Sequence, residues 1–523
     1  MSKRIYIDCN CEVGKRANII NDNIPYTLDA LRQSQKKYGV DRSLAISSKC
    51  FPYSIVTGNE EIIEISKKYE SIIPISTIYP GFEYDIKSAD QYLQYLYENG
   101  VKGIRLDLTK LFIFNKRMFD KVFSFCQKVE MPIIVDWDTI ENKNLFFELL
   151  LEYSNLKIVI TNVNWSFRRY LFSYMKENKN INIGMNGFVY QNMVEDFCQR
   201  FGSERLLFAT GYPLYDVGSV KAMVEYADIS EMEKNNIAYK NAIRIFKLSP
   251  YIKKRKYGED YDEIMKMVDS GENLRKLPFN IIDSHTHFMS EEAGSIDWMG
   301  SESDLHSLIT SSKKIGISEI CTSPLDGLLY DGLVSEKSMV KALNIEEIHI
   351  NGLVTANPYY SEDINNALSK LKKEKYVGLK LYPSKNQYPY DGKLYEPLFE
   401  ETINQGKYFL LHGTTDDARK ILEKYAGLNV ILAHSTQNYK YMDSAIELLK
   451  AYPNLSVDIC NRYMINGAIE YLVSHGCVDQ VVFGSDSSLL SQSAHIGWLS
   501  YSDIGQDNKE KILSKNISRI IRR

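Results

Sequence analysis

Several side chains in the second half of the chain have the types and spacing of metal ligands. Asp283, His285 and His287 alternate along the apolar segment NIIDSHTHF, and residues two apart in a β-strand point to the same side. Three further candidates each follow an apolar run: His412, His434 and Asp486. Imidazoles and a carboxylate suit zinc, with a position left open for water. All eight histidines follow residue 284, so we expect such chemistry only in the second half.

These side chains need a scaffold that brings the ends of separate strands together. From residue 280 onward, short β-rich runs alternate with helical segments, and the predicted strands are 280–286, 318–324, 349–357, 376–383, 408–414, 429–435, 455–461 and 480–486. Alternating strands and helices form a parallel sheet, and eight such units form a (β/α)8 barrel. Because catalytic groups of this fold gather at the carboxyl ends of the strands, we expect the candidates to converge there.

The first half repeats the same order of elements. Its predicted strands are 4–10, 42–48, 72–78, 102–108, 132–138, 156–162, 181–187 and 205–211. Both halves end in a similar helical segment, NAIRIFKL at 241–248 and NISRIIRR at 516–523. We therefore predict an α/β fold of two tandem (β/α)8 TIM-type barrels, at 1–250 and 277–523, joined by a linker at 251–276.

The second half resembles a known family at its strand ends. The segments IDSHTHF, GLKLYP, LLHGT, ILAHS and VVFGSD are similar to signatures of the amidohydrolase superfamily. They look closest to the amidohydrolase 2 group, which includes aminocarboxymuconate-semialdehyde decarboxylase and several lactone and amide hydrolases. The resemblance implies that one divalent metal ion, expected to be zinc, is bound by His285, His287, His412 and Asp486. It also implies that His434 activates water or polarises the substrate.

The chemistry of these groups agrees with hydrolysis. A bound metal lowers the pKa of water to about 7, and Asp486 can take the proton and return it to a leaving group. His434 can stabilise an oxyanion. Lys380 ends the fourth strand, where other branches of the superfamily bridge two metals with a modified lysine; here we expect it to support the site. Tyr382 and Arg462 follow strands four and seven, either as a rim that favours a carboxylate-bearing substrate or as exposed loop residues.

We therefore expect a metal-dependent hydrolase that cleaves a C–N or C–O bond in a small amide or lactone. One alternative is a non-oxidative decarboxylase that uses the same metal site, and another is a catalytically inert ligand-binding or scaffold protein. The HxH pair is also typical of TatD-like nucleases and PHP-type phosphoesterases. However, TatD-like enzymes carry a glutamate at the fourth strand, where this chain has GLKLYP, and a net charge of −4 does not favour nucleic acid.

The first half lacks the ligands while it keeps the barrel pattern. Its residues at the equivalent strand ends, in the order of His285, His287, Lys380, His412, His434 and Asp486, are Asn10, Glu12, Arg105, Asp136, Asn162 and Gly211. We interpret it as a degenerate barrel that pairs internally with the second in place of a partner subunit, although a homo-oligomer remains possible. Cys9 and Cys11 have the opposite parity to Asn10 and Glu12, so we expect both to face outward, toward the helices.

The composition is typical of a soluble globular protein of 523 residues, with 44% apolar and 25% charged residues. No apolar run approaches the length of a membrane span, and the start has no signal-peptide h-region. Eight cysteines without regular spacing do not indicate a disulfide framework. We expect a cytoplasmic protein that acts on a small molecule, with neither nucleic acid nor membrane as a partner.

Overall fold

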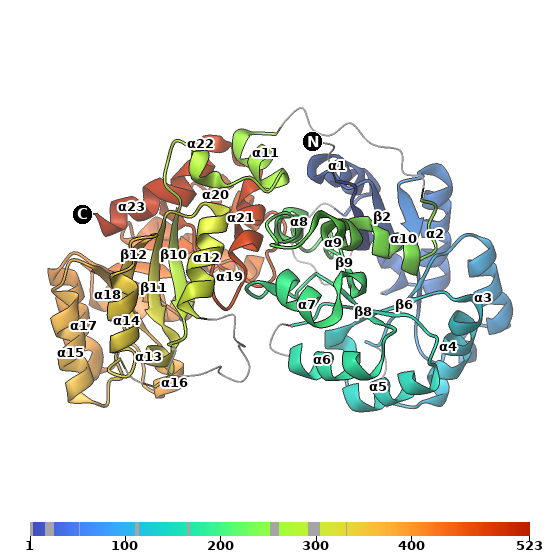
Figure 1. Ribbon diagram of the computed structural model, residues 1–523, viewed down its shortest axis with the longest axis horizontal. Coiled ribbons are helices and arrows are strands. Elements are labelled where there is room, and N and C mark those ends of the chain that lie inside the picture. Colours follow the sequence, from blue (N-terminus) through green and yellow to red (C-terminus); the bar gives the residue numbers. More distant parts are fainter. Residues whose placement is uncertain are drawn as a thin grey trace. The chain divides into compact units, whose positions relative to one another are not determined.

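The chain folds into two compact units, as a computed structural model shows (Figure 1). The first unit comprises Met1–Val189 and Met193–Asp260, and the second comprises Tyr190–Asn192 and Tyr261–Arg523. The structure describes residues 4–15, 26–51, 53–109, 114–164, 168–250, 261–290, 304–330 and 332–522.

The second unit is a parallel eight-stranded barrel. Each strand pairs with the next along the chain, in the order β10 (Ile282–Phe288), β11 (Glu319–Pro324), β12 (His349–Val354), β13 (Tyr376–Leu381), β14 (Tyr408–Leu411), β15 (Asn429–Leu432), β16 (Leu455–Asp458) and β17 (Val481–Val482). The N–H of Ser284 donates to the carbonyl of Phe483 at 2.9 Å, and that of Asp486 to His285 at 2.8 Å. These bonds join the first strand to the last, so the predicted barrel is confirmed here.

Helices follow the strands of this unit, and the longer ones lie around the sheet in Figure 1. They are α11 (Glu263–Asp269), α12 (Leu305–Ile315), α13 (Leu325–Leu329), α14 (Glu336–Leu343), α15 (Ser361–Leu371), α16 (Pro383–Asn386), α17 (Glu396–Asn404), α18 (Thr415–Lys424), α19 (Tyr439–Ala451), α20 (Ala468–Ser474), α21 (Gln492–Ser500), α22 (Gln506–Glu510) and α23 (Asn516–Ile521). Helix α11 lies within the segment predicted as a linker, 251–276, and belongs to the second unit.

Local sequence explains where these helices begin and end. In α12 the Asp304 side chain accepts the N–H of Ser307, which caps the first turn, and Gly316 ends the helix with a φ of 104°. Leu308 and Ile315 form part of its buried face. None of the described helices is both long enough and apolar enough to cross a lipid bilayer.

The first unit has the same order of parallel strands. They are β1 (Ile7–Val13), β2 (Arg42–Ser47), β3 (Ile72–Pro74), β4 (Ser76–Ile78), β5 (Ile104–Leu106), β6 (Ile133–Asp136), β7 (Ile158–Thr161), β8 (Ile181–Gly184) and β9 (Leu206–Leu207). Between β3 and β4, the N–H of Ile75 donates to the carbonyl of Ala45 at 3.0 Å. The N–H of Gly211 donates to Asn10 at 2.9 Å, which joins the last strand to the first. The strand order is therefore that of a parallel barrel here too.

The helices of the first unit follow its strands in turn. They are α1 (Leu28–Tyr38), α2 (Ile55–Lys68), α3 (Ala89–Glu98), α4 (Arg117–Val129), α5 (Lys143–Glu152), α6 (Arg168–Glu177), α7 (Met193–Phe201), α8 (Val217–Glu225), α9 (Glu231–Asn235) and α10 (Asn241–Ile245). The segment after α10 contributes Phe246 to the core of the unit.

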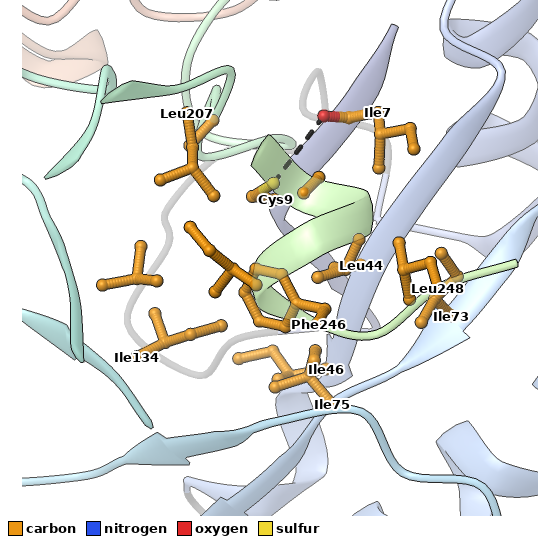
Figure 2. Packing of buried hydrophobic residues seen from close by; sticks show 14 residues of the cluster. Ile7, Cys9, Leu44, Ile46, Ile73, Ile75, Ile134, Leu207, Phe246 and Leu248 are labelled. Carbon is orange, nitrogen blue, oxygen red and sulfur yellow. Dashed lines mark hydrogen bonds between the residues drawn. The ribbon is translucent and has the colours of Figure 1, made fainter. Parts of the chain in front are cut away.

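Figure 2 shows this core, in which side chains from β1, β2, β3, β6 and β9 pack together with Phe246. Cys9 is one of its buried members, so the prediction that both Cys9 and Cys11 face outward was wrong for Cys9. The reason is a register shift in the pairing of β1 with β2 between Asp8 and Cys11. Strict alternation fails across such an irregularity, and counting parity from Asn10 misplaces the residues before it.

The same hydrogen bonds join the first and last strands in both units. The carboxylate of Asp8 accepts the N–H and hydroxyl of Thr210 at 3.0 and 2.5 Å. The carboxylate of Asp283 accepts the N–H and hydroxyl of Ser485 at 3.1 and 2.6 Å. All four residues are buried, so these bonds satisfy polar groups that water does not reach.

Candidate metal centre

Three of the predicted ligands meet at the carboxyl end of the second barrel. The Nε2 atoms of His285 and His287 are 3.1 Å apart. The Oδ1 atom of Asp486 lies 3.5 Å from the first and 3.4 Å from the second. All three side chains are buried. The loop after β17 brings the carboxylate there with a φ of 57° at Asp486, a conformation that few residues adopt.

The remaining ring nitrogens of the pair are held by hydrogen-bond acceptors. Nδ1 of His285 lies 2.8 Å from Oδ2 of Asp458. Nδ1 of His287 lies 3.0 Å from the hydroxyl and 3.3 Å from the carbonyl oxygen of Ser323. Since a carbonyl or carboxylate oxygen only accepts, each Nδ1 carries the proton and each Nε2 keeps its lone pair. The Nε2 lone pairs of His285 and His287 cannot hydrogen-bond to each other, although the two atoms are only 3.1 Å apart. Together with the carboxylate of Asp486, these two nitrogens therefore fit a metal cation.

Burial determines the charge of these groups. It lowers the pKa of His285 and His287 well below the ordinary value, so both rings stay neutral, as metal ligands must be. It also raises the pKa of Asp486 and of Asp458 to about 7. Near neutral pH, the cluster therefore combines neutral imidazoles with carboxyl groups close to their point of ionisation.

Lys380, for which we expect a supporting role, lies in the same cluster. Its Nζ is 3.2 Å from Nε2 of His285, and the side chain is buried. Burial lowers the pKa of this amine to about 8. The ammonium form donates to the imidazole lone pair, and it adds positive charge beside Asp486.

The other two predicted histidines contact each other. Nε2 of His434 lies 3.2 Å from Nδ1 of His412, and His434 has a φ of 59°. The ligand atoms of His285, His434 and Cys460 all lie within 4.8 Å of one another. Among the described residues, His412 belongs to neither of the two groups of close donor atoms. His412 is exposed and His434 half-buried, so the cluster opens to solvent on their side.

Tyr382 lies next to His412, at the side of the cluster that is open to solvent. Arg462 contacts the ring of Tyr463, the next residue in the chain. The ring centroids of Tyr382 and His412 are 5.2 Å apart. Tyr382 also packs on an apolar wall, whose other members are Met289, Leu325, Leu328, Leu329 and Leu489. The guanidinium of Arg462 lies 4.2 Å from the ring centroid of Tyr463.

Asp283 does not share the face of the two histidines. Its carboxylate accepts the side chain of Gln492 in α21 at 3.0 Å, and Gln492 in turn accepts the hydroxyl of Ser312 in α12. The predicted common face was wrong because the pairing of β10 with β11 shifts register between Asp283 and Thr286. Asp283 therefore connects the strand to the surrounding helices.

Two residues near the ligands were not singled out from the sequence. Asp458 ends β16, and its Oδ1 accepts the N–H groups of His434 and Cys460 at 2.8 and 3.1 Å. Cys460 follows two residues later, with its Sγ 3.3 Å from Nδ1 of His434. Both lie in the predicted strand 455–461, and the rule that led to His412 and His434, a polar residue at a strand end, also applies to them.

An ion pair lies at the equivalent place in the first unit. The guanidinium of Arg105 donates to Oδ1 of Asn10 at 2.8 Å and pairs with the carboxylate of Asp136. From the sequence, Arg105, Asn10 and Asp136 are predicted to correspond to Lys380, His285 and His412 of the second unit. Arg105 is buried, so the first unit also holds a buried side-chain cation in one of its strands, β5.

Comparison with known proteins agrees with the family resemblance. The model of the family described as amidohydrolase matches residues 350–523, which confirms the resemblance over that stretch. The match includes β13 to β17 and leaves out β10 with its two histidines. No curated protein matches.

Solved structures similar to this chain cover about half of it. They include 5-carboxyvanillate decarboxylase LigW from Sphingomonas paucimobilis, at 12% identity and a TM-score of 0.38 over 47% of this chain and 99% of that one. A second 5-carboxyvanillate decarboxylase, from Novosphingobium aromaticivorans and complexed with manganese, has 11% identity and a TM-score of 0.39 over 47% and 97%. A putative amidohydrolase from Staphylococcus aureus has 14% identity and a TM-score of 0.38 over 47% and 100%.

Proposed function

We propose that the second unit is a metal-dependent hydrolase of the amidohydrolase type, which cleaves a C–N or C–O bond in a small amide or lactone. The observation that carries this proposal is the pair of Nε2 lone pairs of His285 and His287, 3.1 Å apart and facing the carboxylate of Asp486. The amidohydrolase family match over residues 350–523 supports it. We propose one divalent ion, with zinc as the expected metal because imidazole and carboxylate donors suit it.

The residues around this ion take distinct roles in the proposal. His285, His287 and Asp486 hold the metal, with His412 as a proposed fourth ligand, and a bound metal supplies Lewis-acid polarisation and acidifies water. Asp486, whose pKa burial raises to about 7, takes a proton from the attacking water and returns it to the leaving group. His434, at the half-open side of the cluster, hydrogen-bonds the oxygen on which charge develops.

The surroundings indicate the kind of substrate. The apolar wall of Met289, Leu325, Leu328, Leu329, Tyr382 and Leu489 is continuous with His412 through the ring of Tyr382. An apolar group of the substrate would bury surface there, at roughly 25 cal/mol for each Å² removed from water. We therefore propose a small substrate with an apolar part next to the bond that breaks.

For the first unit we propose a degenerate copy of the same barrel that binds no metal. The matched bonds of Asp8 with Thr210 and of Asp283 with Ser485 support a common origin of the scaffold. Internal pairing with the second unit, in place of a partner subunit, is part of this proposal. All eight cysteines are free and buried, which fits our expectation of a reducing compartment such as the cytoplasm.

The test is an assay of the whole chain after metal removal and reloading with zinc or manganese. Amides and lactones with apolar groups are offered, and release of the amine, alcohol or hydroxy acid is measured. We expect hydrolysis that is lost in His285→Ala and kept in Asn10→Ala, the matched change in the first unit. Release of carbon dioxide from carboxylic acids, without hydrolysis, would favour the decarboxylase alternative. No turnover of either kind by a metal-loaded protein would favour a binding protein.

A further inference from the structure

A second group of potential ligands in the same barrel includes a thiol. The ligand atoms of His285, His434 and Cys460 lie within 4.8 Å of one another. The rings of His285 and His434 have centroids 5.3 Å apart, and Sγ of Cys460 is 3.3 Å from Nδ1 of His434. Cys460 is buried two residues after β16, and its contact with Nδ1 of His434 directs the thiol at the histidine cluster.

The two groups share His285 and differ in the softness of their other donors. One offers the imidazole of His287 and the carboxylate of Asp486, and the other offers the imidazole of His434 and the sulfur of Cys460. Carboxylate oxygens bind zinc as well as manganese and magnesium, whereas a thiolate favours zinc among these three ions. The nitrogen of one imidazole binds one ion, so the ligands that join His285 determine which metal the cluster prefers.

The backbone supports the thiol in this position. Oδ1 of Asp458 accepts the N–H groups of both Cys460 and His434, at 3.1 and 2.8 Å. One carboxylate therefore fixes the two chain segments that carry the soft donors, while its other oxygen holds His285 at 2.8 Å. All three members of the second group are bonded to the same buried residue.

We propose that Cys460 is a further ligand of the metal ion bound by His285, and that its thiolate makes the site selective for zinc over manganese. The inference rests on the proposed metal site of the second unit. Coordination replaces the S–H bond of Cys460 with a metal–sulfur bond and releases the proton to water, with no change of oxidation state. The hydrogen bond between the thiol and Nδ1 of His434 is given up in this step.

Spectroscopy of the whole protein tests this ligand without reference to activity. Loaded with cobalt(II), the protein should show a thiolate-to-cobalt charge-transfer absorption that disappears in Cys460→Ser. The band should remain in Cys477→Ser, a control at another buried cysteine of the same unit. Zinc affinity, measured by chelator competition, should fall about tenfold or more in Cys460→Ser, while manganese affinity changes less than about twofold.

X-ray absorption at the zinc edge of the unaltered protein covers the case in which Cys460→Ser does not fold. A sulfur neighbour at about 2.3 Å from zinc is expected, and a shell of nitrogen and oxygen alone would overturn the inference. If the zinc has only nitrogen and oxygen neighbours and the protein still hydrolyses amides or lactones, the proposed function stands and only the thiolate ligand is disproved. A protein that binds neither zinc nor cobalt overturns both.

Discussion

At the scale of single residues, the site depends on which nitrogen of each imidazole carries a proton. Asp458 and Ser323 hold the Nδ1 protons of His285 and His287, which directs both Nε2 lone pairs to one place. Partners of this kind orient the ligands of metal sites, and their loss typically weakens metal affinity by about 10–100-fold. The cluster is therefore organised by residues that do not themselves touch the metal.

The Asp458→Asn variant tests this organisation. An amide in place of the carboxylate can donate to Nδ1 of His285, which moves the proton of the imidazole to Nε2 and removes its lone pair. We expect zinc affinity to fall by roughly 10–100-fold, as measured by chelator competition. Asp391→Asn, at an exposed loop residue of the same unit, is the control. Equal affinity in the two variants would contradict the role given to Asp458.

The pH dependence of metal binding follows from Asp486. Burial raises its pKa from the ordinary 3.8 to about 7, so the folded metal-free protein keeps this carboxyl protonated at pH values where the unfolded chain has ionised it. Its ionisation as the pH rises toward 7 costs stability in the metal-free fold and at the same time frees the carboxylate for a metal. His285 and His287 are already neutral in this range, and of the two carboxyl groups with a pKa of about 7, Asp486 and Asp458, only Asp486 is a proposed ligand, so we assign the change to it.

We therefore expect zinc affinity to fall by roughly tenfold for each pH unit below about 7, and to level off above it. Chelator competition at several pH values measures this slope. In Asp486→Asn the affinity should be low and the slope absent between about pH 5 and pH 7. If the zinc affinity of Asp486→Asn still fell with decreasing pH, a group other than Asp486 would be the one that titrates.

At the scale of elements, the first strand of each unit shifts its register just before the site. The shift lies between Asp8 and Cys11 in β1 and between Asp283 and Thr286 in β10. Because of this shift in β10, the side chain of Asp283 points outward and binds Ser485 and Gln492 of α21. The side chain of His285, two residues later, points inward to His287. The hydrogen bond from Ser485 to Asp283 also positions the neighbouring residue Asp486. Closure of the barrel and assembly of the site are therefore linked.

Matched variants in the two units test this link. Ser485→Ala and Thr210→Ala each leave a buried carboxyl without one partner, and each should lower the free energy of unfolding by about 1–3 kcal/mol. Only Ser485→Ala should also weaken zinc binding, because Ser485 precedes the ligand Asp486. Urea unfolding and chelator competition measure the two effects. Unchanged zinc affinity in Ser485→Ala would separate barrel closure from the site.

At the scale of the whole molecule, metal binding should distinguish the two units. In the first unit, Arg105 pairs with Asp136 and donates to Asn10, at the positions predicted to correspond to the cluster of the second unit. A ligand at about 100 times its dissociation constant stabilises the unit that binds it by about 2.7 kcal/mol. The stabilisation should therefore appear in one half of the chain only.

Calorimetry with and without zinc, combined with hydrogen exchange, tests this difference. We expect the transition of the second unit to rise by roughly 5 °C or more, with slower exchange in its peptides. Peptides from the first unit should exchange at the same rate in both conditions. Equal protection of both units would mean that the first unit also binds the metal or unfolds together with the second.

The amino-acid sequence by itself determined the barrel architecture and the end of the barrel that carries the candidate site. Runs such as LLHGT and ILAHS are apolar strands that end in a polar residue, and each predicted strand overlaps a strand of the structure, although 72–78 forms two short strands, β3 and β4. Parallel strands connected by helices must put their carboxyl ends together. His285, His287 and Asp486 could therefore be assembled from local patterns alone.

Only the tertiary structure decided which neighbours these ligands have. The register shifts placed Cys9 inside and Asp283 outside, against the alternation that a regular strand would follow. The contact of His412 with His434 depends on a backbone that leaves its strand with a positive φ at His434, and Asp458 and Cys460 reach His434 because β16 pairs with β15. Such turns and shifts are set by packing and hydrogen bonds between segments far apart in the chain, which local hydrophobic patterns do not encode.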